Sequence, residues 1–236
     1  MDDADTSIPA PTALRPLLGL TILVVEDSRF ACEAMRLLCL RSGARIRRAD
    51  CLRSARRHLQ VYRPSAAVVD MGLPDGSGAE LIGELAGASP RIPVILGISG
   101  DAETEITARA AGADGFLVKP VSRLAGFQDA ILAHLPADRQ PRGPRELSTE
   151  RVEPDLMAFR DDMAHLAEVL NEGTEGQTLD YVAQFLRGVA RSARDSDLVH
   201  AADALAAARR EGRATNGDIA RIAGLVQDRL SQDIAI

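Results

Sequence analysis

Short apolar runs alternate with amphipathic stretches between Thr21 and Leu135, and this alternation limits how the chain can fold more than any other feature. The apolar runs predict strands at residues 21–25, 44–48, 66–70, 94–98 and 115–118. The stretches around and between them predict helices at residues 28–40, 51–62, 77–85, 102–111 and 122–134. Strands that alternate with helices build a parallel sheet covered on both faces. We therefore predict an α/β domain with a doubly wound, five-stranded parallel sheet over residues 20–135.

The remainder of the chain has a different pattern. Residues 1–19 are acidic and contain proline, which predicts a flexible segment, and the polar, proline-marked residues 136–154 predict a linker. Helical periodicity without any strand-like run then follows at residues 155–171, 178–194, 196–211 and 215–234. We predict an all-helical second domain over residues 155–236, built as a small antiparallel bundle.

Composition narrows the class of protein. A net charge of −6 argues against nonspecific binding to nucleic acid, which needs a surplus of Lys and Arg. The three cysteines, Cys32, Cys39 and Cys51, have no metal-ligand spacing and are typical of reduced thiols. We find neither a signal peptide nor an apolar stretch long enough to span a bilayer, so we expect a cytoplasmic protein without a membrane partner.

Polar residues occur at the carboxyl ends of four predicted strands. Glu26 and Asp27 follow the first strand, and Asp70 ends the third. Ser99 follows the fourth strand, and Lys119 follows the fifth. An open parallel sheet places its ligand crevice at these ends. One pocket is therefore expected to contain three carboxylates, a hydroxyl and an ammonium.

Such a pocket favours phosphoryl chemistry. Three clustered carboxylates repel one another, and hard oxygen ligands without His or Cys favour Mg²⁺, so Glu26, Asp27 and Asp70 are candidate metal ligands. A cation there would offset repulsion between the acids and a phosphoryl donor, which makes Asp70 a candidate nucleophile that forms an acyl phosphate. Lys119 would supply a positive charge and Ser99 a hydroxyl donor.

These residues resemble the receiver domain of two-component response regulators over residues 21–135, with a flavodoxin-like fold. The resemblance implies that Glu26 and Asp27 are the acidic metal pair and that Asp70 is the phosphoacceptor. It also implies that the backbone carbonyl of Gly72 completes the Mg²⁺ site. Ser99 would be the switch hydroxyl, Phe116 the switch aromatic residue, and Lys119 the lysine that precedes a cis-prone proline, Pro120.

Two residues depart from the pattern of that family. Glu26 replaces the commoner first aspartate, and Phe116 lacks the hydroxyl of the tyrosine that many members carry. Neither change removes a required chemical group, although Phe116 cannot make the phenolic hydrogen bond that helps to hold the inward rotamer.

The resemblance implies a response regulator that accepts a phosphoryl group from a sensor histidine kinase or a histidine-phosphotransfer protein. We expect a phosphoacceptor signalling protein rather than an enzyme, with at most weak self-phosphatase activity. Its output would be a protein–protein interaction of the helical domain with a downstream protein, and a homodimer remains open.

The helical half leaves alternatives open. It has no helix-turn-helix signature and more acidic than basic residues, so we do not expect DNA binding. His165 and His200 are candidate phosphohistidines, and the alanine-rich helix places Asp203 where a phosphohistidine would stand, which is similar to a degenerate histidine-phosphotransfer bundle. The chain could then be a phosphorelay intermediate. A scaffold that works without phosphorylation is the other alternative.

Overall fold

The computed structural model describes residues 10–143, 147–173 and 176–232. It confirms the predicted five-stranded parallel sheet, whose strands lie in the order β2-β1-β3-β6-β7. The strands are β1 (Thr21–Val25), β2 (Arg45–Ala49), β3 (Ala66–Asp70), β6 (Val94–Ser99) and β7 (Gly115–Val118). The three central strands, β1, β3 and β6, are apolar because helices cover both of their faces.

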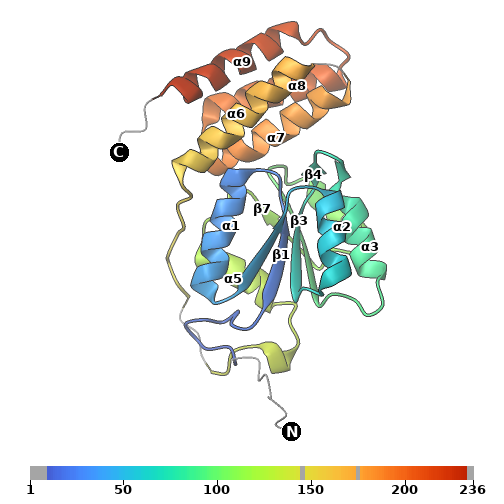
Figure 1. Ribbon diagram of the computed structural model, residues 1–236, viewed down its shortest axis with the longest axis vertical. Coiled ribbons are helices and arrows are strands. Elements are labelled where there is room, and N and C mark those ends of the chain that lie inside the picture. The colour runs from blue at the N-terminus through green and yellow to red at the C-terminus, as the bar shows by residue number, and fades with distance from the viewer. Residues whose placement is uncertain (1–9, 144–146, 174–175, 233–236) are drawn as a thin grey trace.

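Helices cover the sheet on both sides (Figure 1). The helices α1 (Arg29–Ser42) and α5 (Leu124–Leu132) pack on one face, and the helices α2 (Leu52–Val61), α3 (Gly78–Gly87) and α4 (Thr104–Ala110) pack on the other. Local signals define α1 at both ends. The side chain of Ser28 accepts a hydrogen bond from the Ala31 backbone N–H, and Gly43 ends the helix with a φ of 85°, which glycine adopts without steric cost.

The sequence did not predict a short antiparallel hairpin after β3. Its strands are β4 (Gly72–Leu73) and β5 (Gly76–Ser77). The hairpin leads into α3, where Ser77 is the N-cap. It therefore holds the backbone directly after Asp70 at the carboxyl edge of the sheet.

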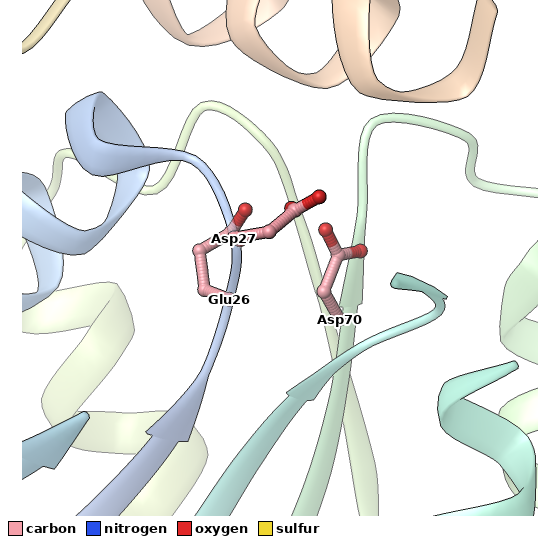
Figure 2. Close-up of side chains that lie close together, drawn as sticks. All are labelled: Glu26, Asp27 and Asp70. Carbon is pink, nitrogen blue, oxygen red and sulfur yellow. The ribbon is translucent and has the colours of Figure 1, made fainter. Parts of the chain in front are cut away.

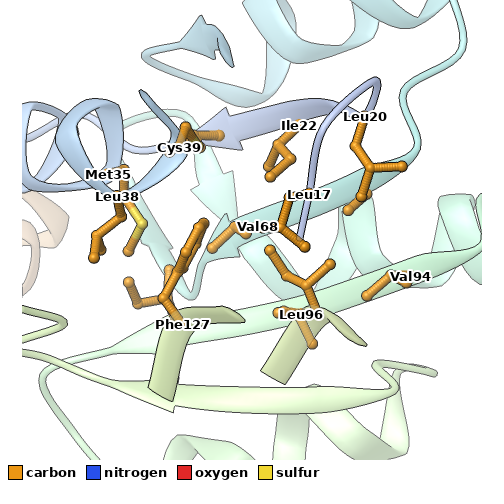
Figure 3. Close-up of a cluster of buried hydrophobic side chains, with 14 of the residues drawn as sticks. Leu17, Leu20, Ile22, Met35, Leu38, Cys39, Val68, Val94, Leu96 and Phe127 are labelled. Carbon is orange, nitrogen blue, oxygen red and sulfur yellow. The ribbon is translucent and has the colours of Figure 1, made fainter. Parts of the chain in front are cut away.

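The larger core of the α/β domain lies between the sheet and the helices α1 and α5 (Figure 3). Phe127 of α5 is fully buried there against residues of the sheet. Leu17 and Val152 also belong to this core, although they come from the segments predicted as flexible and as a linker. The backbone N–H of Val152 donates to the carbonyl of Ser122 over 2.8 Å, so the segment is fixed along α5 before the chain leaves the domain.

Four helices follow, as predicted. They are α6 (Leu156–Glu172), α7 (Gln177–Ala193), α8 (Ser196–Arg210) and α9 (Asn216–Ser231). A separate apolar core joins them, with Leu186, Leu198 and Leu205 fully buried. Asp155 and Asp195 cap α6 and α8 through their carboxylates.

The bundle lies on the carboxyl edge of the sheet, above the ends of β1 and β3 (Figure 1). The helices α6 and α7 pack against α1, and α7 also packs against β4. Phe30, in the first turn of α1, belongs to the core of the bundle and lies edge-to-face on Phe159, with ring centroids 5.8 Å apart. The two domains thus share an apolar contact. No helix among the residues described is long and apolar enough to cross a membrane.

Candidate functional site

The carboxyl ends of β1 and β3 bring three acids together. One carboxylate oxygen each of Glu26, Asp27 and Asp70 lies within 4.8 Å of the others, and Figure 2 shows the three side chains gathered below a helix of the bundle. Within the part of the chain that the structure describes, they form the only His, Cys, Asp or Glu group of three arranged in this way. Parallel neighbouring strands explain the convergence, because Val25 is in register with Val69.

Lys119 supplies the positive charge of this cluster. Its Nζ lies 2.8 Å from Asp70 Oδ2 and 2.7 Å from Glu26 Oε2. The lysine is 4% exposed, and it follows the end of β7. Burial alone would lower the pKa of Lys119, but the carboxylates of Asp70 and Glu26 outweigh burial and raise it above its usual value.

One ammonium does not neutralise three clustered acids, of which Glu26 and Asp70 are buried and Asp27 is half-buried. Burial raises the pKa of Glu26 well above its usual value, and the charge of Asp70 raises it further. Burial and the charge of Asp70 likewise raise the pKa of Asp27, to about 7. The cluster therefore has a deficit of positive charge. Its donors are hard oxygens at a separation that one small cation can bridge, so these residues fit Mg²⁺.

The remaining residues of the predicted site lie around the cluster. Ser99 is buried at the end of β6, and its Oγ accepts a hydrogen bond from the Asp101 backbone N–H over 3.0 Å. The Gly72 backbone N–H points to Asp70 Oδ1 at 3.4 Å. Phe116 on β7 is half-buried and lies on Gly97, where an added Cβ would be 2.9 Å from the ring. The roles that the resemblance implies for these three residues stay predictions.

The two candidate histidines lie outside the acidic cluster. His165 is exposed on α6, with its Nε2 3.3 Å from Tyr181 Oη and its ring against Phe185. His200 is exposed on α8. Asp203, which the sequence placed at a phosphohistidine position, pairs with Arg187 Nε over 2.7 Å.

Sequence reasoning missed the residues of the bundle that reach the site. Tyr181 of α7 donates a hydrogen bond to Asp27 Oδ2 over 2.8 Å. Asp162 of α6 accepts from Ser28 Oγ and from the backbone N–H groups of Arg29 and Phe30, over 2.7, 2.7 and 3.1 Å. These partners lie more than 130 positions apart in the chain, and no local pattern marks them.

Comparisons with known proteins match the α/β domain. Residues 22–129 match the family model described as the response regulator receiver domain. The transcriptional regulatory protein KdpE of Mycobacterium tuberculosis is 29% identical over 155 residues, which is 65% of this chain and 65% of that protein. The KDP operon transcriptional regulatory protein KdpE of Escherichia coli is 31% identical over 99 residues, covering 42% of this chain and 44% of that protein. The chain therefore spans less than two thirds of these relatives.

Solved structures match the same half of the chain. A response regulator structure from Chloroflexus aurantiacus is 28% identical and covers 48% of this chain and 98% of its own, with a TM-score of 0.45. The receiver domain of a sensor histidine kinase from Pseudomonas aeruginosa, solved with a magnesium ion in its active site cleft, is 22% identical. It covers 49% of this chain and 96% of its own, with a TM-score of 0.44.

Proposed function

Because residues 22–129 form a response regulator receiver domain, we propose that Asp70 accepts a phosphoryl group from a phosphohistidine in a Mg²⁺-dependent reaction. The observation that carries this proposal is the group formed by Asp70, two further acids and Lys119 at the carboxyl edge of the sheet. Glu26, Asp27, Asp70 and the carbonyl of Gly72 would hold the Mg²⁺. When bound, the ion offsets the negative charge of the acids and of the incoming phosphoryl oxygens.

The residues of the chain then have distinct roles. A carboxylate oxygen of Asp70 attacks phosphorus, the new O–P bond forms, and the N–P bond to the donor imidazole breaks. The imidazole leaves with the bonding electron pair. Lys119, which already contacts Asp70, pairs with a phosphoryl oxygen, and the hydroxyl of Ser99 is placed to donate to another.

The partners follow from this chemistry. The donor would be a sensor histidine kinase or a histidine-phosphotransfer protein, and the output a contact of the helical domain with a downstream protein. We propose a cytoplasmic phosphoacceptor rather than an enzyme, with self-phosphatase activity at most weak. The relatives above are named transcriptional regulators, so they do not support our expectation that the chain does not bind DNA.

Intact-protein mass spectrometry tests the central step. We expect acetyl phosphate with Mg²⁺ to add one phosphoryl group that hydroxylamine removes, as it does from acyl phosphates. Asp70→Asn should abolish the adduct. Asp50→Asn, which changes an exposed aspartate outside the acidic cluster, is the matched control and should keep it. An adduct that survives Asp70→Asn would contradict the proposal, and a label on His165 or His200 would favour a phosphorelay.

A further inference from the structure

The helix α7 covers the acidic cluster. A Cβ built on Gly188 would lie 3.4 Å from Lys119 Nζ, and one built on Gly100 would lie 3.4 Å from the Cα of Gly188. The side chain of Gln184 lies against Gly72, where an added Cβ would be 2.0 Å from its amide. Gly188 of α7 therefore lies close to Lys119 and Gly100, and the side chain of Gln184 lies against Gly72. Figure 2 shows a helix of the bundle above the three acids.

Polar contacts hold this helix and its neighbour in place on both sides. Tyr181 bonds to Asp27 on one side, and Arg187 Nη1 bonds to Asp101 Oδ2 over 3.0 Å on the other. Asp162 of α6 accepts three hydrogen bonds at the start of α1 and is 1% exposed. A buried carboxylate with three donors is a specific contact, because water would otherwise have to replace all of them.

The cover closes the approach to the phosphoacceptor. Asp70 is 6% exposed and Ser99 is 3% exposed. Two clefts flank α7, with volumes of about 1160 and 850 Å³, and Asp70 lines neither of them. A phosphorus atom must come within bonding distance of an Asp70 oxygen, in line with its leaving group, and the contacts of α7 lie over that approach.

We propose that the face formed by α6 and α7 occupies the surface on which the phosphohistidine donor must bind, so that docking of the bundle and phosphorylation of Asp70 exclude each other. This inference rests on the proposed function. Because only molecules with an undocked bundle can react, release of the bundle raises the rate of phosphorylation. Because the two states exclude each other, a phosphoryl group on Asp70 in turn favours release of the bundle. The released face would then expose more of Tyr181 and Arg187, which are half-buried in the docked state, to a downstream protein.

A pair of glycine substitutions in the full chain tests the inference. Gly188→Leu puts a large side chain between α7 and Lys119. Leucine is a better helix former than glycine, so the substitution should not weaken α7 itself. Gly224→Leu on α9 is the matched control, because an added Cβ at Gly224 meets nothing within 4 Å. We expect Gly188→Leu to acquire the acetyl-phosphate adduct at Asp70 about tenfold faster or more than the wild type, and Gly224→Leu to match the wild type.

A second variant distinguishes release of the bundle from a change in folding. Asp162→Asn removes the α6 carboxylate that accepts hydrogen bonds at the start of α1, and it leaves the acidic cluster unchanged. It should also speed the labelling of Asp70 by acetyl phosphate. Circular dichroism checks that both variants keep their helices, and hydrogen exchange of the Arg29 and Phe30 amides reports release of α6. Beryllofluoride with Mg²⁺ should increase exchange at these amides in the wild type.

The possible results separate the two claims. Equal or slower labelling of folded Gly188→Leu and Asp162→Asn, with Asp70 still labelled, overturns mutual exclusion and leaves the proposed function standing. A lack of any adduct at Asp70 in all variants, the released ones included, overturns the proposed function and the inference with it.

Discussion

The acidic cluster of the receiver domain and the capping residue Asp195 of the bundle have opposite environments. Glu26 is buried and Asp27 is half-buried beside Asp70, and burial with that neighbouring charge raises the pKa of both. Asp195, at the start of α8, is paired with Arg229, whose hydrogen bonds outweigh the effect of burial and lower the pKa of the aspartate. The acidic cluster gathers like charges, whereas Asp195 is paired with a cation.

This contrast indicates where like charges lower the stability of the fold. The paired acids of the bundle stabilise helix ends and helix contacts, as in Asp195 with Arg229. The acidic cluster instead needs a cation beyond Lys119 to be fully ionised, as the proposed Mg²⁺ site would require. Asp162 lies at the junction, where burial raises the pKa of a carboxylate that the bundle presents to α1.

The largest expected effect compares the two cores. Phe127→Ala in the receiver core should lower the free energy of unfolding by about 4 kcal/mol, and Leu205→Ala in the bundle core should lower it by about 3 kcal/mol, because both side chains are fully buried. Urea denaturation followed by circular dichroism measures this. Since Phe30 joins the two domains, we expect a single transition in both variants. Two separate transitions in the wild type would contradict this expectation. Leu14→Ala, at an exposed position, is the control and should change the free energy of unfolding little.

The next prediction compares two cations. Lys119→Met leaves buried acids without a partner and should cost about 3 kcal/mol at pH 8 without Mg²⁺. Arg229→Met removes an ion pair that is less deeply buried and should cost about 1 kcal/mol. Excess Mg²⁺ should recover part of the loss in the first variant and none in the second, as measured by urea denaturation. Equal losses and equal recovery would remove the contrast between the two domains.

The affinity for Mg²⁺ should depend on pH. Burial and the Asp70 charge raise the pKa of Asp27 to about 7, so the metal-free protein holds a proton there below this pH. Mg²⁺ must displace that proton, and its affinity should fall by up to about tenfold per pH unit below pH 7. Isothermal titration calorimetry from pH 5.5 to 8 measures this. Asp195→Asn in the bundle should leave the profile unchanged; a flat profile in the wild type would contradict the expectation.

The smallest expected effect compares the two tyrosines. Tyr181→Phe loses the hydrogen bond to Asp27 and should lower the free energy of unfolding by about 1 kcal/mol. The hydroxyl of Tyr62 is buried without a hydrogen-bond partner among the described residues, so Tyr62→Phe should be neutral or stabilising. Thermal and urea denaturation of the two variants measure the difference. If Tyr62→Phe lowers the free energy of unfolding as much as Tyr181→Phe does, then the hydrogen bond from Tyr181 to Asp27 adds no stability of its own.

The sequence predicted the five parallel strands and the four later helices because hydrophobic periodicity is a local signal. It also predicted that Glu26, Asp27, Asp70 and Lys119 would meet, because parallel strands bring their carboxyl ends to one edge. The β4–β5 hairpin was missed because strands of two residues carry too little pattern to be recognised.

By itself, then, the sequence determined the fold of each domain and which residues meet in the acidic cluster, since both depend on side-chain pattern and strand order. Only the tertiary structure decided that Asp162 and Tyr181 reach across from the bundle and that Gly188 lies over Lys119. The physical reason is that the two domains join through hydrogen bonds, ion pairs and the apolar contact of Phe30 with the bundle, all between residues far apart in the chain. Such pairings depend on shape and position, which no periodicity along the sequence encodes.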